Sequence, residues 1–266
     1  MISKTSYKQE KYSIEDFLEV MKILREPGGC PWDIEQTHKS IRRDLLEEAY
    51  ETADAIDLDD KDALCEELGD LLLQVVFHSD IARRNGEFTF DDVVDGITKK
   101  LILRHPHVFG DVEADTAAQV LENWDAIKRV EKHQDSYTDT LESVPRAFPA
   151  LLRAAKVQKR AAKAGFDWDE MSGAFEKLNE ETAELKAAVE SGVQCDIDEE
   201  FGDLLFSMVN VSRFIKTDAE ASLAKATDKF IARFKLVEDK CVKQGKDMKE
   251  MSLKELDDIW NSIKYN

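Results

Sequence analysis

The sequence predicts an all-α protein that is a tandem repeat of two related helical-bundle domains. Apolar residues recur at intervals of three and four in IEDFLEVMKIL (14–24) and FGDLLFSMVNVSRFI (201–215), the spacing of one helix face. Clear strand alternation is absent. The phrase EELGDLLLQVVF (66–77) also returns as EEFGDLLFSMVN (199–210). A repeated phrase of this length indicates that one helical unit occurs twice.

The repeat keeps a constant register over a longer stretch. Five residues of the first half recur at an offset of 133 (181 minus 48, for example): Glu48, Glu51, Glu67, Gly69 and Asp70 return as Glu181, Glu184, Glu200, Gly202 and Asp203. Between the halves, the polar stretch 131–149 contains two prolines and few large apolar side chains. We therefore predict an N-terminal domain over 1–134, a linker over 135–147 and a C-terminal domain over 148–266.

Helix boundaries have local signals. Capping boxes are predicted at Thr116-x-x-Gln119, Thr217-x-x-Glu220 and Ser252-x-x-Glu255. All five prolines precede residue 150, so no proline interrupts the helices of the second half.

Composition narrows the class of protein. The chain has 266 residues, 56 acidic against 37 basic, and a formal charge of −19. A field of that sign repels nucleic acids and anionic membranes. No apolar run approaches the roughly 20 residues that span a bilayer, and the polar start lacks the apolar core of a secretory signal. The four cysteines are scattered and are expected to be reduced, in a cytoplasmic protein.

The repeated acids form pairs on helix faces. Residues three apart share a helix face, so the two side chains of each acidic pair project from the same face. The pairs are Glu48/Glu51 and Glu67/Asp70 in the first half, and Glu181/Glu184 and Glu200/Asp203 in the second. If the two helices of each half pack antiparallel, about 8–10 Å apart, four carboxylates converge on one small volume. Their mutual repulsion, about 4 kcal/mol per close pair at an effective dielectric of 20, would be relieved by a divalent cation. An all-oxygen set suits Mg²⁺, with Mn²⁺ as a substitute.

Two other interpretations compete with this metal site. An isolated ExxE or ExxD pattern is usually a solvated acidic face. Here, however, the pairs recur in fixed order beside apolar residues. A ferritin-like di-iron centre requires a Glu-x-x-His motif on two helices, and neither acidic set contains a histidine. The pattern therefore favours magnesium.

Basic and aromatic residues also recur. Lys100/Arg104 and Lys229/Arg233 are pairs at i,i+4 that could neutralise phosphate oxygens, although exposed charges would give the same pattern. Trp124 and Trp260 could stack on a base or belong to a core. The stripe of Lys156, Lys159, Arg160 and Lys163 in 154–165 could assist anion binding or form a solvated face.

Longer phrases add a resemblance. The phrases GGCPWDIEQTHKSI, ELGDLLLQVVFHSDIA, RHPHVFGD, VQKRAAKAGFDW and EEFGDLLF resemble the all-α nucleoside triphosphate pyrophosphohydrolases and, within them, the two-domain MazG family. The resemblance runs from about residue 15 to residue 264. The acidic motif identifies only the superfamily, whereas CPWD, RHPHVF and GFDW are specific to the two-domain members.

The resemblance implies Mg²⁺-dependent hydrolysis of nucleoside triphosphates to monophosphate and pyrophosphate, with broad base tolerance, by a homodimer. It implies metal ligands at Glu181, Glu184, Glu200 and Asp203, phosphate binding by Lys229 and Arg233, and a base contact from Trp260. Lys177 and Glu180 complete the predicted nucleotide-binding set. Glu180 or Glu199 is a candidate proton acceptor.

The resemblance also implies that catalysis occurs mainly in the C-terminal domain, although the N-terminal half keeps the second acidic set of Glu48, Glu51, Glu67 and Asp70. That apparent redundancy supports an alternative function, a nucleotide-sensing module that uses metal sites for binding with little turnover.

Overall fold

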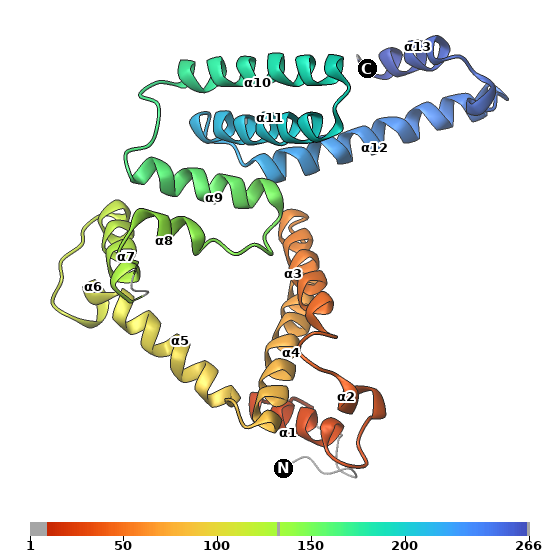
Figure 1. Cartoon of the computed structure of the whole chain (residues 1–266). Helices are drawn as coiled ribbons and strands as arrows, with labels where there is room; N and C mark the ends of the chain where they lie inside the picture. Colours follow the sequence, from red (N-terminus) through yellow and green to blue (C-terminus); the bar gives the residue numbers. More distant parts are fainter. Residues whose placement is uncertain (1–9, 132–133, 265–266) are drawn as a thin grey trace. The chain divides into compact units, whose positions relative to one another are not determined.

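The computed structural model of the chain describes residues 10–131 and 134–264 (Figure 1), and within these ranges it contains helices and turns but no strand. The all-α prediction is therefore confirmed. The polar start, over residues 1–9, lies outside the described residues. The chain divides into two compact units, one ending at Ile127 and the other beginning at Lys128.

Unit 1 is a set of helices around two long ones. Its helices are α1 (Ile14–Arg25), α2 (Pro31–Glu35), α3 (Arg42–Asp57), α4 (Lys61–Asn85), α5 (Phe90–Arg104), α6 (Pro106–Phe109) and α7 (Ala117–Glu131), the last of which crosses into unit 2. Helix α3 packs along α4, and α1 packs on the C-terminal half of α4. A small core of Met21, Ile41, Val76, Phe77 and Ile81 forms at that junction.

A buried arginine connects the first two helices to α4. Arg25 is 3% exposed, and its Nε lies 2.7 Å from Asp80 Oδ2. Its guanidinium also donates to the carbonyl oxygens of Asp33 and Gln36 and lies over the ring of Phe77. Gly29 belongs to the same turn, where a Cβ would come within 2.2 Å of the Leu24 carbonyl oxygen. The chain between α1 and α2 is therefore fixed against α4.

Unit 2 repeats the order of unit 1. Its helices are α8 (Tyr137–Glu142), α9 (Ala150–Lys163), α10 (Met171–Ser191), α11 (Gln194–Phe214), α12 (Ala219–Lys243), the 3₁₀ turn η1 (Met248–Glu250) and α13 (Leu253–Lys264). Helix α10 packs along α11 as α3 packs along α4, while α9 packs on both α11 and α12. Gly192 ends α10 in the left-handed region, with φ of 72°, and allows the short turn into α11.

The segment expected to be a linker is partly helical. Helix α8 lies within 135–147 and packs on α9, and Arg160 donates to the Thr140 carbonyl and the Ser143 hydroxyl. Ser136 begins α8 with a full capping box, a signal that the proline-rich surroundings obscure. The domain limits of 1–134 and 148–266 stay a prediction.

Two of the three predicted capping boxes are confirmed. Thr116 and Gln119 exchange hydrogen bonds at the start of α7, and Ser252 and Glu255 do so before α13. The third was wrong by one residue. Asp218, not Thr217, caps α12 by accepting from the Ala221 amide. Glu220 instead accepts a hydrogen bond from the backbone amide of Leu152 in α9.

Gly173 in α10 lies directly under an indole. A Cβ there would come within 2.3 Å of Trp168 Cδ1. We expect Gly173→Ala to displace Trp168 and to destabilise unit 2 by about 1 kcal/mol, because overpacking of about 1–3 kcal/mol exceeds the helix-propensity gain. The control is Gly96→Ala in α5, where a Cβ has open space and stabilisation of about 0.5–1 kcal/mol is expected. Urea denaturation with tryptophan fluorescence measures both. Unchanged emission in Gly173→Ala would contradict the packing role.

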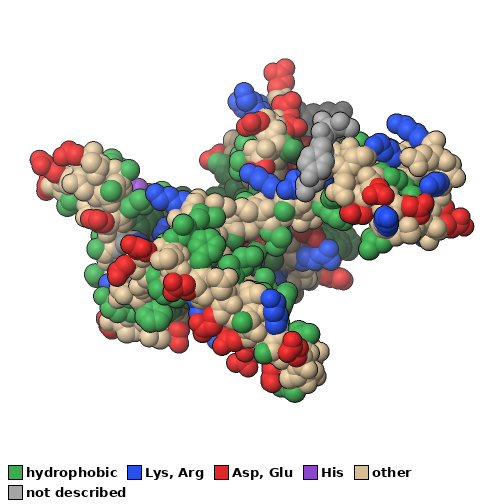
Figure 2. All heavy atoms as spheres, turned by 90° about the horizontal axis from the view of Figure 1, so that it is seen from above, with side chains coloured by type: hydrophobic (Ala, Val, Ile, Leu, Met, Phe, Trp, Pro, Cys, Tyr) green, Lys and Arg blue, Asp and Glu red, His purple; other side chains and the backbone are tan. Residues whose placement is uncertain are grey.

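Many large apolar side chains stay exposed in the single chain. On the face that Figure 2 shows, hydrophobic side chains lie open to solvent among acidic ones. On α11 and α12 the exposed residues include Phe201, Leu205, Met208, Phe230, Ile231 and Phe234. No helix in the described part of the chain is long and apolar enough to cross a membrane.

Candidate metal centre

The predicted acids of unit 2 meet between α10 and α11. Glu181 and Glu184 lie on α10, while Glu200 and Asp203 lie on α11. Carboxylate oxygens of Glu181, Glu200 and Asp203 lie within 4.8 Å of one another, a separation that one metal ion can bridge. A second group of the same kind joins Glu180, Glu181 and Glu184. Glu181 belongs to both groups and is the centre of the arrangement.

Glu181 is a buried carboxylate with one nearby cation. Its side chain is 5% exposed, and Lys177 Nζ lies 2.6 Å from its Oε1 and 2.7 Å from Glu180 Oε1. Hydrogen bonds to Glu180 and Glu181 raise the pKa of Lys177 well above its usual range. Lys177, predicted to bind nucleotide, is thus the counter-ion of Glu181 in this structure.

The α11 carboxylates repel their neighbours. Burial raises the pKa of Glu200, and the charges of Glu184 and Glu181 raise it further. A carboxyl group with a raised pKa is one whose ionised form lacks sufficient compensation. An oxygen-liganded divalent cation placed among these groups would supply it, so the residues present fit Mg²⁺.

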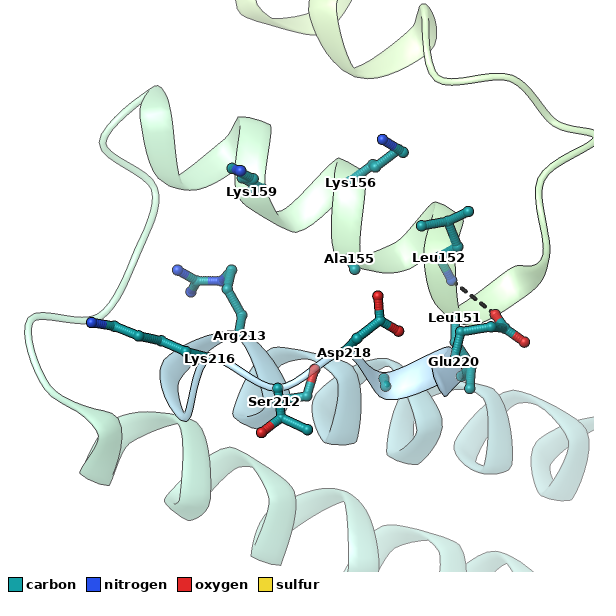
Figure 3. A pocket seen from close by; sticks show the side chains of 12 residues that line it. Leu151, Leu152, Ala155, Lys156, Lys159, Ser212, Arg213, Lys216, Asp218 and Glu220 are labelled. Atoms are coloured by element: carbon teal, nitrogen blue, oxygen red, sulfur yellow. Dashed lines mark hydrogen bonds between the residues drawn. The ribbon is translucent and has the colours of Figure 1, made fainter. Parts of the chain in front are cut away.

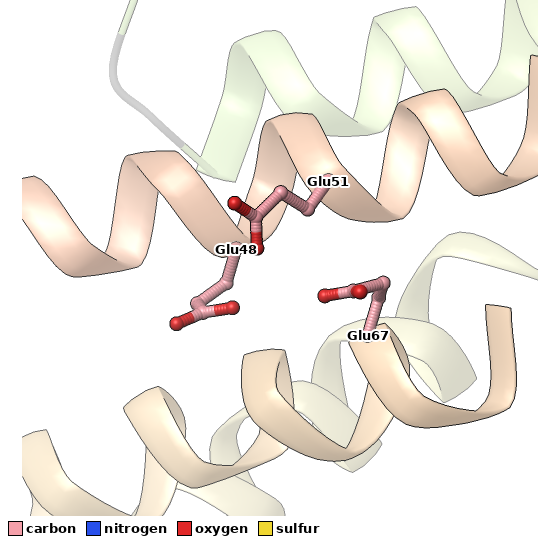
Figure 4. Close-up of side chains that lie close together, drawn as sticks. All are labelled: Glu48, Glu51 and Glu67. Carbon is pink, nitrogen blue, oxygen red and sulfur yellow. The ribbon is translucent and has the colours of Figure 1, made fainter. Parts of the chain in front are cut away.

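Unit 1 carries an equivalent centre between α3 and α4. Glu48, Glu51 and Glu67 point toward one another across the two helices, with carboxylate oxygens within 4.8 Å (Figure 4). Burial raises the pKa of Glu48, with a further contribution from Asp70, and burial and Glu51 raise that of Glu67. Asp70 is thus a neighbour of this centre without joining the three-residue group.

The basic and aromatic residues form a separate cluster in each unit. The Arg104 guanidinium lies 5.4 Å from the ring centroid of Trp124, and that of Arg233 lies 5.8 Å from Trp260. Trp260 also packs 5.3 Å from Phe230, between ring centroids. Within the described residues, the contacts of Arg233 and Trp260 join α12 to α13 and do not include the four acids. Lys229 is exposed on the same helix.

Comparison with known proteins decides the family. The model of the MazG nucleotide pyrophosphohydrolase domain matches twice, at residues 36–109 and 171–240. The chain is also 45% identical over 250 residues to the nucleoside triphosphate pyrophosphohydrolase/pyrophosphatase MazG of Thermotoga maritima, covering 94% of this chain and 95% of that one. The chain belongs to the MazG family.

Other MazG relatives agree. The nucleoside triphosphate pyrophosphohydrolase of Escherichia coli K12 is 43% identical over 254 residues, which is 94% of this chain and 97% of that protein. The uncharacterized protein YabN of Bacillus subtilis is 45% identical over 97% of this chain, and the match spans 53% of YabN. The family prediction is confirmed, and the two matches of the MazG domain confirm the tandem repeat.

Because carboxylates crowd together at both centres, we expect the stability of this MazG chain to depend on pH. The pKa values of Glu48, Glu67 and Glu200 are raised above the ordinary value of 4.5. Between that value and the raised pKa, the folded chain binds more protons than the unfolded chain. Unfolding therefore releases protons, and this contribution to stability falls as the pH rises. The penalty is absent below 4.5 and complete above the raised pKa.

We therefore expect the metal-free parent to lose stability, relative to Glu200→Gln, as the pH rises above 4.5. Mg²⁺ should suppress the difference by stabilising the ionised form. Thermal melts in EDTA and in Mg²⁺ measure it. Other carboxyls contribute equally to the parent and the variant, so their contributions to the pH dependence of stability cancel in the comparison. One example is Asp167, whose pKa is lowered by Arg213 and whose contribution to stability is lost as the pH falls. Parallel pH profiles of the two proteins would contradict the prediction.

Two further features depend on contacts between separate helices. The Arg25–Asp80 pair joins residues 55 positions apart. A cavity of about 370 Å³ lies between α9 and the turn from α11 to α12 (Figure 3), and it includes Lys156 and Lys159 of the predicted basic stripe. Arg160 of the same stripe instead donates a hydrogen bond to Ser143, at the end of α8.

Proposed function

We propose that this chain hydrolyses nucleoside triphosphates to the monophosphate and pyrophosphate in a Mg²⁺-dependent reaction, with broad base tolerance and with unit 2 as the main catalytic unit. The observation that carries the proposal is the meeting of Glu181, Glu200 and Asp203 within 4.8 Å between α10 and α11. Membership of the MazG family adds the reaction class, since the relatives from Thermotoga maritima and Escherichia coli K12 are named nucleoside triphosphate pyrophosphohydrolases.

The acids have distinct proposed roles. Glu181, Glu200 and Asp203 would hold the metal, with Glu184 beside them and within range of Glu181. When bound, Mg²⁺ would supply charge neutralisation for the phosphate oxygens during attack by water. Lys177 would orient Glu181, because its ammonium donates to that carboxylate.

Two observations bear on the choice of proton acceptor. Of the two candidates, Glu180 accepts a hydrogen bond of 2.7 Å from Lys177, which occupies one of its oxygens. Glu199 is exposed next to Glu200 and is close enough to raise the pKa of that carboxyl. We therefore favour Glu199 as the group that accepts a proton from the attacking water.

Lys229 and Arg233 would bind phosphate oxygens, and Trp260 would contact the base. In the single chain Arg233 lies over the Trp260 ring, which packs against Phe230. This contact fixes the guanidinium and the indole relative to each other, as two parts of one nucleotide site require. The cluster recurs in unit 1 as Arg104 over Trp124.

We also propose a homodimer. Large apolar side chains on α11 and α12, including Phe201, Met208 and Ile231, are more than half exposed, and a group of exposed apolar residues marks an interaction surface. Gly202 has open space where a Cβ would point, so another helix can approach closely there. Light scattering coupled to size-exclusion chromatography should give about twice the 30.3 kDa chain mass. A mass of one chain at micromolar concentration would contradict this part.

A regulatory role for unit 1 is the second candidate. Arg104 is 7% exposed, whereas its counterpart Arg233 is only half-buried. A buried guanidinium is less accessible to a phosphate, so unit 1 would bind metal with little turnover of its own. We also propose a cytoplasmic location and, because the chain is acidic, no binding of nucleic acid.

A panel of nucleoside and deoxynucleoside triphosphates tests the function. With Mg²⁺, each substrate should yield its monophosphate and pyrophosphate, at rates that differ modestly between bases, and EDTA should stop the reaction. Release of orthophosphate and a diphosphate would contradict the proposed cleavage. Tight nucleotide binding without turnover would favour the sensing module instead.

A further inference from the structure

Unit 2 contains a cavity apart from its acidic centre. It is lined by α9 on one side and by the α11–α12 turn on the other, and its volume is about 370 Å³ (Figure 3). Ser212, at its edge, lies roughly 13 Å of helix beyond Asp203, at 1.5 Å per residue. None of the four proposed metal ligands lines it. The cavity is therefore distinct from the proposed catalytic site.

The charged side chains that line the cavity are mostly basic, whereas the chain as a whole is acidic. The chain as a whole carries −19, yet four basic side chains line this cavity against two acidic ones. The four are Lys156, Lys159, Arg213 and Lys216. A small cation-lined hollow on an acidic protein attracts small anions while the remaining surface repels larger polyanions.

Both lining acids already have partners. Asp218 caps α12 through a hydrogen bond of 2.9 Å from the Ala221 amide. Glu220 accepts from the Leu152 amide at 3.2 Å, in the first turn of α9. These carboxylates therefore satisfy helix N-termini, and neither forms an ion pair with Lys159 or Lys216 in the described chain.

Arg213, at one end of the cavity, is held rigidly and its charge is balanced by Asp167, so Lys159 and Lys216 supply the positive charge there. Asp167 accepts two hydrogen bonds from the Arg213 guanidinium, and Asn210 accepts two more, which holds that group in place. Figure 3 shows Lys159, Arg213 and Lys216 toward this end, with Glu220 at the other. Ala155 lies between the two ends, and Leu151 and Leu152 add apolar surface beside Glu220.

The turn itself supports a role for Lys216. Its φ is 58°, in the left-handed region that favours glycine; in the turn after α4 of unit 1 the left-handed residue is a glycine, Gly86, with φ of 73°. Unit 2 thus places a lysine at a position where a side chain is disfavoured, and that lysine lines the cavity.

We propose that this cavity is a second binding site, separate from catalysis, for a small phosphorylated molecule. Its phosphate group would lie between Lys159, Arg213 and Lys216, and the rest of the molecule would cover Leu152 and Ala155. The cavity volume suits a compact ligand such as pyrophosphate or a nucleoside monophosphate. Ammonium and guanidinium groups bind phosphate through charge-assisted hydrogen bonds.

Calorimetric titration of the full chain tests the site. The titrants are orthophosphate, pyrophosphate and adenosine monophosphate, each in EDTA so that no divalent metal can hold phosphate at the acidic centre. The parent should bind at least one of them. Tightest binding of adenosine monophosphate would identify a nucleotide ligand, and tightest binding of pyrophosphate an inorganic one.

The double variant Lys159→Gln/Lys216→Gln should bind about tenfold more weakly or worse, because two charge-assisted contacts are lost. Lys243→Gln is the matched control, an exposed lysine at the end of α12 that does not line the cavity. Absence of binding to the parent would overturn the proposal, as would equal affinities of the double variant and the parent.

Lysine acetylation of the parent, read by mass spectrometry, supplies an independent result that needs no variant. The bound ligand should protect Lys159 and Lys216 while Lys243 stays reactive. Equal protection of all three would overturn the proposal. Since neither measurement involves turnover, the outcome does not depend on the proposed hydrolysis.

Discussion

Glu200→Gln is expected to reduce nucleotide hydrolysis by about 10²-fold or more while the fold is retained, because losing a metal ligand weakens charge neutralisation in the transition state. The amide keeps the shape of the side chain and removes its charge. Since the carboxyl has a raised pKa from burial and from Glu184 and Glu181, its neutralisation should leave the metal-free chain at least as stable as the parent. Steady-state kinetics and thermal melts in EDTA measure the two effects.

The matched control is Glu67→Gln, the same change at the equivalent position of unit 1. If unit 2 is the main catalytic unit, this variant keeps most of the activity. It should nevertheless lose part of the Mg²⁺-dependent rise in melting temperature, because Glu67 belongs to the second acidic group. Equal losses of activity in both variants would show that the two units work together or that both are catalytic.

Arg25→Ala is expected to cost unit 1 about 3–5 kcal/mol of stability, the usual result of removing one member of a buried ion pair. Burial alone would raise the pKa of Asp80, but hydrogen bonds from Arg83 and Arg84 lower it, so the carboxylate is ionised. Removal of Arg25 also leaves the carbonyls of Asp33 and Gln36 without their donor. Urea denaturation followed by circular dichroism measures the loss.

The control for Arg25 is Arg43→Ala. Arg43 pairs with Glu47 at 2.7 Å on an open helix face, where the two side chains are 84% and 48% exposed. Exposed pairs of this kind contribute about 0.3–0.5 kcal/mol. A loss below about 1 kcal/mol for Arg25→Ala would show that Asp80 is adequately held by Arg83 and Arg84 without it.

Helix-face spacing was sufficient to predict the acidic centres. Glu181 and Glu184 are three residues apart, as are Glu200 and Asp203, so each pair had to share a face once the helices formed. The short turn at Gly192 then made the two helices neighbours. Because the same spacing recurs at an offset of 133, the tandem repeat followed from the sequence as well.

Contacts between distant segments could not be predicted in this way. No local pattern connects Arg25 with Asp80, or Lys159 with Lys216, because each pair meets only through packing of separate helices. The capping box expected at Thr217 was wrong for a related reason. Glu220, its expected acid, bonds to Leu152 on another helix, and the neighbouring Asp218 caps α12 in its place. Tertiary contacts thus overrode a local signal.

The division of roles among the acidic residues also required the structure. Spacing alone predicted Glu181 and Glu184 as metal ligands without distinguishing between them. In the structure Glu181 is buried, is hydrogen-bonded to Lys177 and belongs to both three-residue groups of unit 2. Gly69 and Gly202 remain unexplained within a single chain, because a Cβ at either would meet open space.

Phosphorus NMR of a nucleoside triphosphate incubated with the chain and Mg²⁺ tests the central claim most directly. The three resonances of the substrate should be replaced by one monophosphate and one pyrophosphate signal in equal molar amounts, with no orthophosphate at early times. The same sample made with Glu200→Gln should keep the substrate signals over that period. Orthophosphate and nucleoside diphosphate as first products, or full conversion by Glu200→Gln, would contradict hydrolysis between the α- and β-phosphates at the acidic centre of unit 2.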